Sequence, residues 1–248
     1  MQKVTVEGEI GGRKIVLETG RIAKQADGAV MCYYGECVVL GTAVHADPRP
    51  GIDFFPLTVD YREKAYAAGK FPGGFFKREG RPTSKEILTM RMIDRPIRPL
   101  FPEGFMDEIQ IQTAVLAADP TFDADITSIN ASSAALSLSS APFEGPVGAV
   151  RVGRVEGQLI INPTYAEMEV SDLDLVLAGH KDGVNMIEVG AHEVSEEDML
   201  AAIAFGYDAI KVLCGLIAEL REKAGKPRDW TPPTSNDELM RAVRDKAY

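Results

Sequence analysis

The segment from residue 69 to residue 82, GKFPGGFFKREGRP, combines residue types that bind single-stranded nucleic acid. Its aromatic and basic candidates are Phe75, Phe76, Lys77, Arg78 and Arg81. Phenyl rings stack on bases of any sequence, for ~1–3 kcal/mol per base, while neighbouring cations neutralise the phosphates. The alternative is structural, with one or both rings anchoring a glycine-rich loop in the core and the cations facing water. The residues by themselves leave both interpretations open.

A second group of cations stands in the sequence IDRPIRPLFPEGF, residues 93–105. Arg95 and Arg98 flank Pro96, and planar guanidinium groups can bind phosphate in bidentate fashion. They are candidates for a secondary contact with RNA or another anion. The alternative is an ion pair with one of the neighbouring carboxylates, Asp94, Glu103 or Asp107.

The charge of the chain is unevenly distributed. The formal net charge is −10, which argues against a polyanionic partner. Residues 62–98, however, hold ten basic and four acidic side chains, so this segment is +6 and the remainder is −16. An acidic body with one basic segment would direct RNA to that segment and discourage adsorption elsewhere.

Other candidate sites are weak. The cysteines are odd in number and form no CxxC pair, which predicts three small buried hydrophobic residues, Cys32, Cys37 and Cys214. Three histidines without periodic relation are expected to be structural: His45, His180 and His192. Asp172 and Asp174 share one face of a predicted strand, but no further metal ligand accompanies them. We therefore predict no metal site in this chain.

The same sequence lacks membrane and export signals. No run approaches the ~20 uncharged apolar residues of a membrane helix. The first residues alternate like a strand and lack the basic and apolar regions of a signal peptide. The prediction is a cytoplasmic protein that does not cross a membrane.

Strands clustered between a few helices predict an α+β fold that would position these residues. Apolar patterning predicts strands at residues 4–10, 14–18, 37–45, 54–61, 109–117, 147–155, 158–162, 173–178 and 186–191. A first helix is capped by Thr83 or Ser84 and stopped by Pro96, and a small-residue helix follows at 126–139. The longest helix is capped by Ser195 and ends at Gly225.

A domain boundary is expected after residue 225. Residues 226–234 are proline-rich and predict a linker, and the S-x-x-E capping box from Ser235 begins a new helix over 235–248. Such a helix has nothing obvious to pack on, so we expect the chain to be the first part of a longer protein. The alternative is a terminal helix that docks back on the domain.

Four segments of this chain resemble the first core domain of the two-core phosphorolytic exoribonucleases in the RNase PH family. The segments are ETGRIAKQADGAV at 18–30, the strand at 37–46, GKFPGGFFKREGRP at 69–82 and RMIDRPIRPLFPEGF at 91–105. The resemblance covers nearly the whole chain. It implies a ribosomal protein S5 domain 2-like fold, with mixed β-sheets packed against helices, for residues 1–225, and the start of an all-helical domain after the linker.

The resemblance also implies an activity for the complete enzyme. Such enzymes are homotrimeric rings that degrade RNA processively from the 3′ end, using inorganic phosphate and Mg²⁺ and releasing nucleoside diphosphates, and they carry KH and S1 domains. Their active core holds the metal with an Asp-x5-Asp-x-Lys arrangement and binds phosphate with a run of serines. Resemblance further suggests an endoribonuclease partner in an RNA-degrading assembly.

This chain departs from the family pattern at both sites. The second aspartate falls on Asp174, whereas Met168 and Val176 replace the first aspartate and the lysine. The serine run falls on residues 123–125, Asp-Ala-Asp, and carboxylates repel phosphate. We therefore expect no catalytic residue and no bound cofactor here, with catalysis in a second core outside this sequence.

Two further interpretations compete with this one. The first is a stand-alone RNA-binding or scaffold domain without enzymatic activity, which only the sequence after Tyr248 would exclude. The second is a single-core phosphorolytic nuclease, which the residues at Met168 and Val176 disfavour. The preferred function is binding and guiding single-stranded RNA within a trimeric exoribonuclease.

Overall fold

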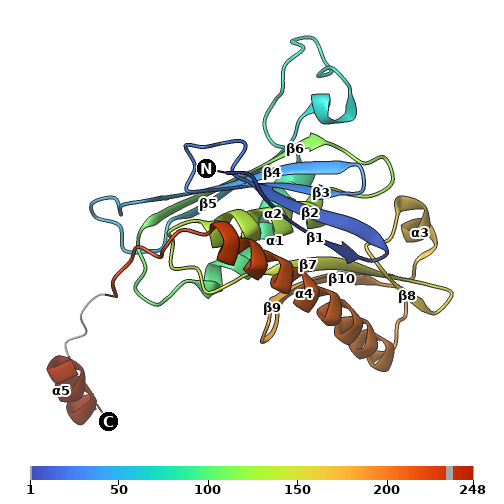
Figure 1. Ribbon diagram of the computed structural model, residues 1–248. Helices are drawn as coiled ribbons and strands as arrows, with labels where there is room; N and C mark the ends of the chain where they lie inside the picture. Colours follow the sequence, from blue (N-terminus) through green and yellow to red (C-terminus); the bar gives the residue numbers. More distant parts are fainter. Residues whose placement is uncertain (1, 233–236, 248) are drawn as a thin grey trace.

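The computed structural model describes residues 2–232 and 237–247, and its core is built from two β-sheets and the helices packed with them (Figure 1). The larger sheet consists, in spatial order, of β1 (Val4–Ile10), β2 (Arg13–Thr19), β3 (Gly28–Tyr34), β4 (Cys37–Ala46), β6 (Glu108–Ala117) and β5 (Leu57–Glu63). β5 and β6 pair in parallel, and the other neighbours are antiparallel.

The smaller sheet is antiparallel throughout. Its strands, in spatial order, are β10 (Gly183–Ala191), β9 (Leu173–His180), β7 (Gly148–Val155) and β8 (Gln158–Ile161). The α-helices are α1 (Ser84–Ile97), α2 (Asp125–Leu138), α3 (Tyr165–Val170), α4 (Glu196–Ala224) and α5 (Asp237–Ala247). Short 3-10 turns occur at η1 (Ala65–Ala68) and η2 (Arg98–Leu100). The predicted α+β class is confirmed.

Helix α2 forms the centre of the core. All of its residues are buried, because it packs on β3 and β4 on one side and on β7 and α4 on the other. Its small side chains let the larger sheet come close: a Cβ at Gly28 would lie 1.8 Å from the Ala135 carbonyl oxygen, and one at Gly41 would lie 2.6 Å from that of Ala131. Glycine is therefore required at both positions.

Helix α1 begins as predicted but ends later. Thr83 is the N-cap, and its hydroxyl and the Glu86 carboxylate form a capping box. The prediction that Pro96 stops this helix is wrong, since α1 continues to Ile97. Pro96 stands in the last turn, where its missing N–H removes only one helical hydrogen bond, and its carbonyl accepts a hydrogen bond from Asn185 Nδ2 at 2.9 Å.

Three other elements differ from the sequence expectation. β3 has no predicted counterpart, because it is a central strand buried on both faces and lacks polar alternation. β5 begins at Leu57 rather than residue 54, and Phe55 instead packs on Phe101 with ring centroids 4.6 Å apart. α3 was not predicted, although its T-x-x-E capping box, from Thr164 to Glu167, is a usable signal.

Helix α4 is the one described helix that is long and apolar enough, by length and composition, to cross a membrane. Asp208 and Lys211 interrupt it, so α4 contains no run of ~20 uncharged apolar residues, as expected from the sequence. Its apolar face contains Ala202, Ile210, Leu213 and Ile217, which are buried where the helix packs on β1, β7, β9 and α2. The burial of that face accounts for the apolar composition of the helix.

The residues directly after α4 are bound to the core of the domain. The Lys226 and Asp229 amides donate to the carbonyls of Leu138 and Ser140, and Trp230 packs edge-on against Phe105. The first part of the predicted linker is thus attached to the domain. The capping box predicted at Ser235 lies outside the described residues, and the described side chains of α5 from Leu239 onward are exposed.

Candidate nucleic-acid interface

Residues 64–82, here called the arm, leave the end of β5 and return at the start of α1, projecting from the larger sheet (Figure 1). The Phe75 ring is 94% exposed and the Phe76 ring 81%, and they touch edge to face with centroids 5.5 Å apart. The interpretation that these rings anchor the loop in the core is therefore wrong. Phe71, which sequence analysis did not single out, is also exposed, at 92%.

The cations of the arm are available to a ligand. Lys77, Arg78 and Arg81 are exposed, and none of them forms an ion pair with another residue in the described part of the chain. The one acidic residue of the arm, Glu79, instead accepts a hydrogen bond from the Ala65 amide at 2.8 Å. Rings and charges on the arm thus face solvent together.

Arg95 and Arg98 are already engaged in the structure. Arg98 pairs with Asp94, as the structural alternative expected, and also donates to the Phe55 and Leu57 carbonyls at 3.1 and 3.2 Å. Arg95 pairs with Glu188 on β10, far away in the sequence and not among the expected partners. Arg98 thus fastens α1 to the start of β5, and Arg95 fastens it to the smaller sheet.

An open pocket of about 570 Å³ lies between α1, the start of α2 and strands β9 and β10. Both segments that the family pattern singled out line it, with Asp123 and Asp125 on one side and Asp174 and Val176 on the other. Met168 is not among its lining residues and belongs to α3. Lys85 and Arg151, which sequence analysis did not weigh as site residues, also line this pocket.

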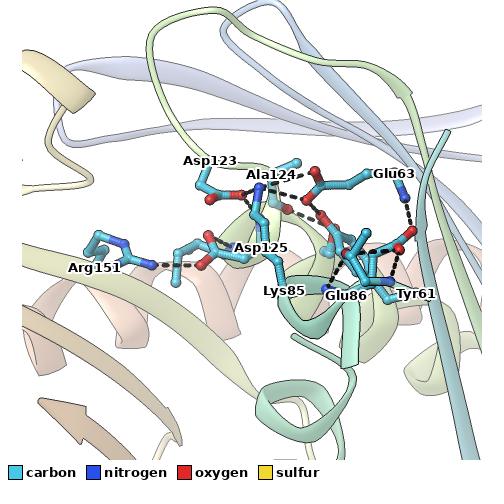
Figure 2. Close-up of polar contacts among 11 residues, drawn as sticks. Tyr61, Glu63, Lys85, Glu86, Asp123, Ala124, Asp125 and Arg151 are labelled. Carbon is cyan, nitrogen blue, oxygen red and sulfur yellow. Dashed lines mark hydrogen bonds and ion pairs between the residues drawn. The ribbon is translucent and has the colours of Figure 1, made fainter. Parts of the chain in front are cut away.

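Basic side chains that line this pocket neutralise its carboxylates (Figure 2). Arg151 Nη2 lies 2.6 Å from Asp125 Oδ2, and the other terminal nitrogen of Arg151 pairs with Asp174. Lys85 Nζ lies 3.0 Å from Asp123 and 3.0 Å from Glu63. Each of these carboxylates, which could otherwise bind a metal ion, is therefore already paired with an arginine or lysine side chain.

The electrostatics of the pocket follow from burial. Burial raises the pKa of Asp125, although the Arg151 guanidinium acts against the rise. Burial also opposes the charged form of Lys85, but the carboxylates of Asp123 and Glu63 outweigh it and raise the Lys85 pKa. Lys85 is therefore a fixed cation rather than a proton donor at neutral pH.

The pocket residues do not fit a magnesium ion. Mg²⁺ requires several oxygen ligands in near-octahedral geometry, and here Val176 and an arginine stand beside the carboxylates. Across the described residues, no group of three or more His, Cys, Asp or Glu side chains is arranged to hold a metal. Ser132 and Ser133 are buried within α2, where their hydroxyls bond to the Thr113 side chain and the Val147 amide.

His45, Asp172 and the three cysteines have structural contacts. His45 lies between Ser140 and Asp107, at 3.2 and 2.9 Å. Asp172 pairs with Arg154. All three cysteines are buried, as predicted, and burial raises the pKa of Cys37 to about 12 and of Cys214 to about 11, so neither is a thiolate nucleophile.

Removing the Arg151 guanidinium should destabilise the domain. In Arg151→Met the buried Asp125 carboxylate loses its cation, and we expect the free energy of unfolding to fall by ~3–5 kcal/mol in urea denaturation. The double variant Arg151→Met/Asp125→Asn removes the unpaired charge and should recover part of that loss. Equal stability of Arg151→Met and the unmodified protein would show that the ion pair is unimportant.

Comparisons with known proteins agree with the fold, and the matched residues include the arm. Residues 11–142 match the model of the 3′ exoribonuclease family, domain 1, and residues 145–209 match domain 2 of the same family. Rice Rrp46 has a similar structure, with a TM-score of 0.65, 16% identity and coverage of 88% of this chain and 94% of that one. At this identity the similarity supports the fold alone.

Curated relatives are much closer in sequence. A polyribonucleotide nucleotidyltransferase of Acidobacterium capsulatum is 57% identical over 247 residues, covering 99% of this chain and 30% of the relative. One of Koribacter versatilis is 54% identical over 237 residues, covering 95% of this chain and 29% of the relative. The chain thus spans about a third of the length of these relatives.

Proposed function

This chain belongs to the 3′ exoribonuclease family, and we propose that it is the first core of a polynucleotide phosphorylase, where it holds and guides single-stranded RNA. The observation that carries the proposal is the arm, in which two exposed rings stand beside unpaired cations. Stacking of bases on Phe75 and Phe76, with phosphates against Lys77, Arg78 and Arg81, holds RNA of any sequence. RNA binding that does not depend on base identity suits an enzyme that moves along its substrate.

The complete protein would act as a phosphate-dependent 3′-to-5′ exoribonuclease in mRNA degradation. Inorganic phosphate attacks the phosphorus of the terminal phosphodiester, the bond to the 3′ oxygen of the preceding nucleotide breaks, and a nucleoside 5′-diphosphate leaves. The reverse reaction extends RNA. The pocket of this core has its carboxylates neutralised by Arg151 and Lys85, which favours a second core as the site of phosphate, Mg²⁺ and catalysis.

The assembly belongs to the same proposal. Family resemblance supports a homotrimeric ring in which each subunit contributes one arm to a central channel. It also supports a cytoplasmic location and association with an endoribonuclease. A stand-alone RNA-binding or scaffold domain is less well supported, because relatives at 54–57% identity are about three times longer than this chain.

The cationic half of the arm is tested by the salt dependence of RNA binding. For single strands, each neutralised phosphate contributes a slope of about −0.7 to the plot of log affinity against log salt. The triple variant Lys77→Gln, Arg78→Gln and Arg81→Gln should therefore bind oligoadenylate more weakly and reduce the slope by about two. Filter binding of the full-length protein between low and moderate salt measures both quantities.

A control removes two cations elsewhere. Lys211 and Lys223 are half-exposed on α4, which Figure 1 shows well apart from the arm. Their replacement by glutamine should leave both affinity and slope close to those of the unmodified protein. An affinity that does not change with salt, or an equal loss in both variants, would contradict a specific role for the arm cations.

A further inference from the structure

The Glu86 carboxylate connects the two ends of the arm. Its Oε1 accepts a hydrogen bond from the Glu63 amide at 3.0 Å. Its Oε2 accepts from the Thr83 amide at 2.7 Å and from the Thr83 hydroxyl at 3.0 Å. Glu63 is the last residue of β5 and Thr83 the cap of α1, so one side chain ties the residues on either side of the arm. Figure 2 shows the Glu86 side chain beside Glu63.

Burial makes this contact stronger than a surface hydrogen bond. Glu86 is only 8% exposed although it belongs to the first turn of a surface helix. Its burial favours the neutral acid, but the amides of Thr83 and Glu63 outweigh this and lower the Glu86 pKa. Hydrogen bonds to a charged acceptor are about twice as strong as neutral ones.

Neighbouring contacts hold the same base of the arm, where Glu63 and Thr83 meet at Glu86 and which is here called the stem. The Glu63 carboxylate accepts from the Tyr61 hydroxyl and pairs with Lys85 Nζ at 3.0 Å, while Lys85 also reaches Asp123 (Figure 2). Further out, Glu79 bonds to the Ala65 amide across the arm. Beyond this second bridge, the tip carries Phe75 and Phe76, whose rings contact each other. These contacts therefore form the base from which the tip of the arm projects.

We propose that Glu86 is a positioning residue for RNA binding: it closes the stem of the arm and so holds Phe75 and Phe76 where the strand passes. The inference rests on the proposed function of the arm. It adds a residue that would not itself touch RNA, and it assigns the buried carboxylate a role beyond capping α1.

Glutamine at position 86 isolates this role from helix capping. A carboxylate has two acceptor oxygens, and here Oε1 serves Glu63 while Oε2 serves Thr83. A glutamine side chain has one acceptor oxygen and is compatible with a capping box. Glu86→Gln can therefore retain the cap of α1 but must release one end of the arm.

The experiment combines hydrogen exchange with RNA binding in the full-length protein. In Glu86→Gln we expect amide exchange in peptides covering residue 63 to accelerate by ~10-fold or more, because the Glu63 amide loses its charged acceptor. Exchange at residue 83 should stay close to that of the unmodified protein, because the cap of α1 is retained. Affinity for oligoadenylate should fall several-fold. In a Phe75→Ala/Phe76→Ala background the same change should lower affinity much less, because only the cations of the arm remain to be misplaced.

Glu103→Gln is the matched control, since it removes one carboxylate charge at an exposed residue. It should change neither exchange at the stem nor affinity. Unchanged exchange in Glu86→Gln overturns the inference, and so does faster exchange with full affinity while the ring variant binds weakly. If the ring variant itself binds normally, the proposed function fails, and the exchange data still report separately whether Glu86 closes the stem.

Discussion

Replacing both rings of the arm by alanine is expected to weaken RNA binding by the full-length protein by at least ~10-fold. Each stacked base contributes ~1–3 kcal/mol, and 1.4 kcal/mol corresponds to about tenfold in affinity. Because the Phe75 and Phe76 rings are exposed, their loss opens no cavity in the domain. The measurements are the equilibrium dissociation constant for oligoadenylate and the number of nucleotides removed per binding event.

The control for this variant is another exposed phenylalanine. Phe54 is 62% exposed and lies in the loop between β4 and β5, outside the arm. Phe54→Ala also removes an exposed phenyl ring but should leave affinity and processivity unchanged. Thermal unfolding should be nearly identical for all three proteins. Normal processivity in Phe75→Ala/Phe76→Ala would rule out stacking on the arm as the basis of the grip.

The second large effect concerns catalysis. The chain of 248 residues by itself should release no nucleoside diphosphate from RNA in the presence of phosphate and Mg²⁺. Loss of one preorganised group that stabilises the transition-state charge typically lowers kcat by about 10²–10³. The family pattern places an aspartate and a lysine at the positions of Met168 and Val176. In the structure Arg151 neutralises Asp125 and Asp174. Turnover should therefore be below detection.

Chromatographic detection of labelled nucleoside diphosphate gives the answer. The full-length protein at the same molar concentration serves as the positive control, and circular dichroism establishes that the shorter chain is folded. Robust phosphorolysis by the short chain would contradict the assignment of this core as non-catalytic. It would also require that phosphate bind in the pocket between α1 and β9 although Lys85 and Arg151 are already paired with its carboxylates.

Local sequence patterns predicted most elements of the fold. They did not predict the elements that are determined by tertiary packing. Alternation placed β1 and β2, a high content of Val and Thr placed β4, and capping residues placed the starts of α1 and α4. β3 was missed because a strand buried on both faces has no alternation to detect. The end of α1 was placed one residue early, because proline lowers helix propensity without specifying where the backbone must stop.

The candidate site shows the same division. Composition alone singled out the rings and cations of the arm, since tandem aromatic residues beside cations and glycines are unusual in a core. Sequence could not show that the rings are exposed, because a glycine-rich loop can equally fold inward. It also missed Arg151, Lys85 and Glu86 as site residues, whose partners on other elements become neighbours only when α1, α2 and β7 pack together.

By itself the sequence determined the class of the domain, its family and the residue types available for binding RNA. The class, the family and the residue types depend on short-range periodicity and on motif identity, and both can be recognised in consecutive residues. The tertiary structure alone decided that the arm is closed at its stem and that the carboxylates of the pocket are paired. Both depend on ion pairs and hydrogen bonds between distant segments, such as Arg151 with Asp125 and Glu63 with Glu86, which form only where the folded backbone brings those groups within reach.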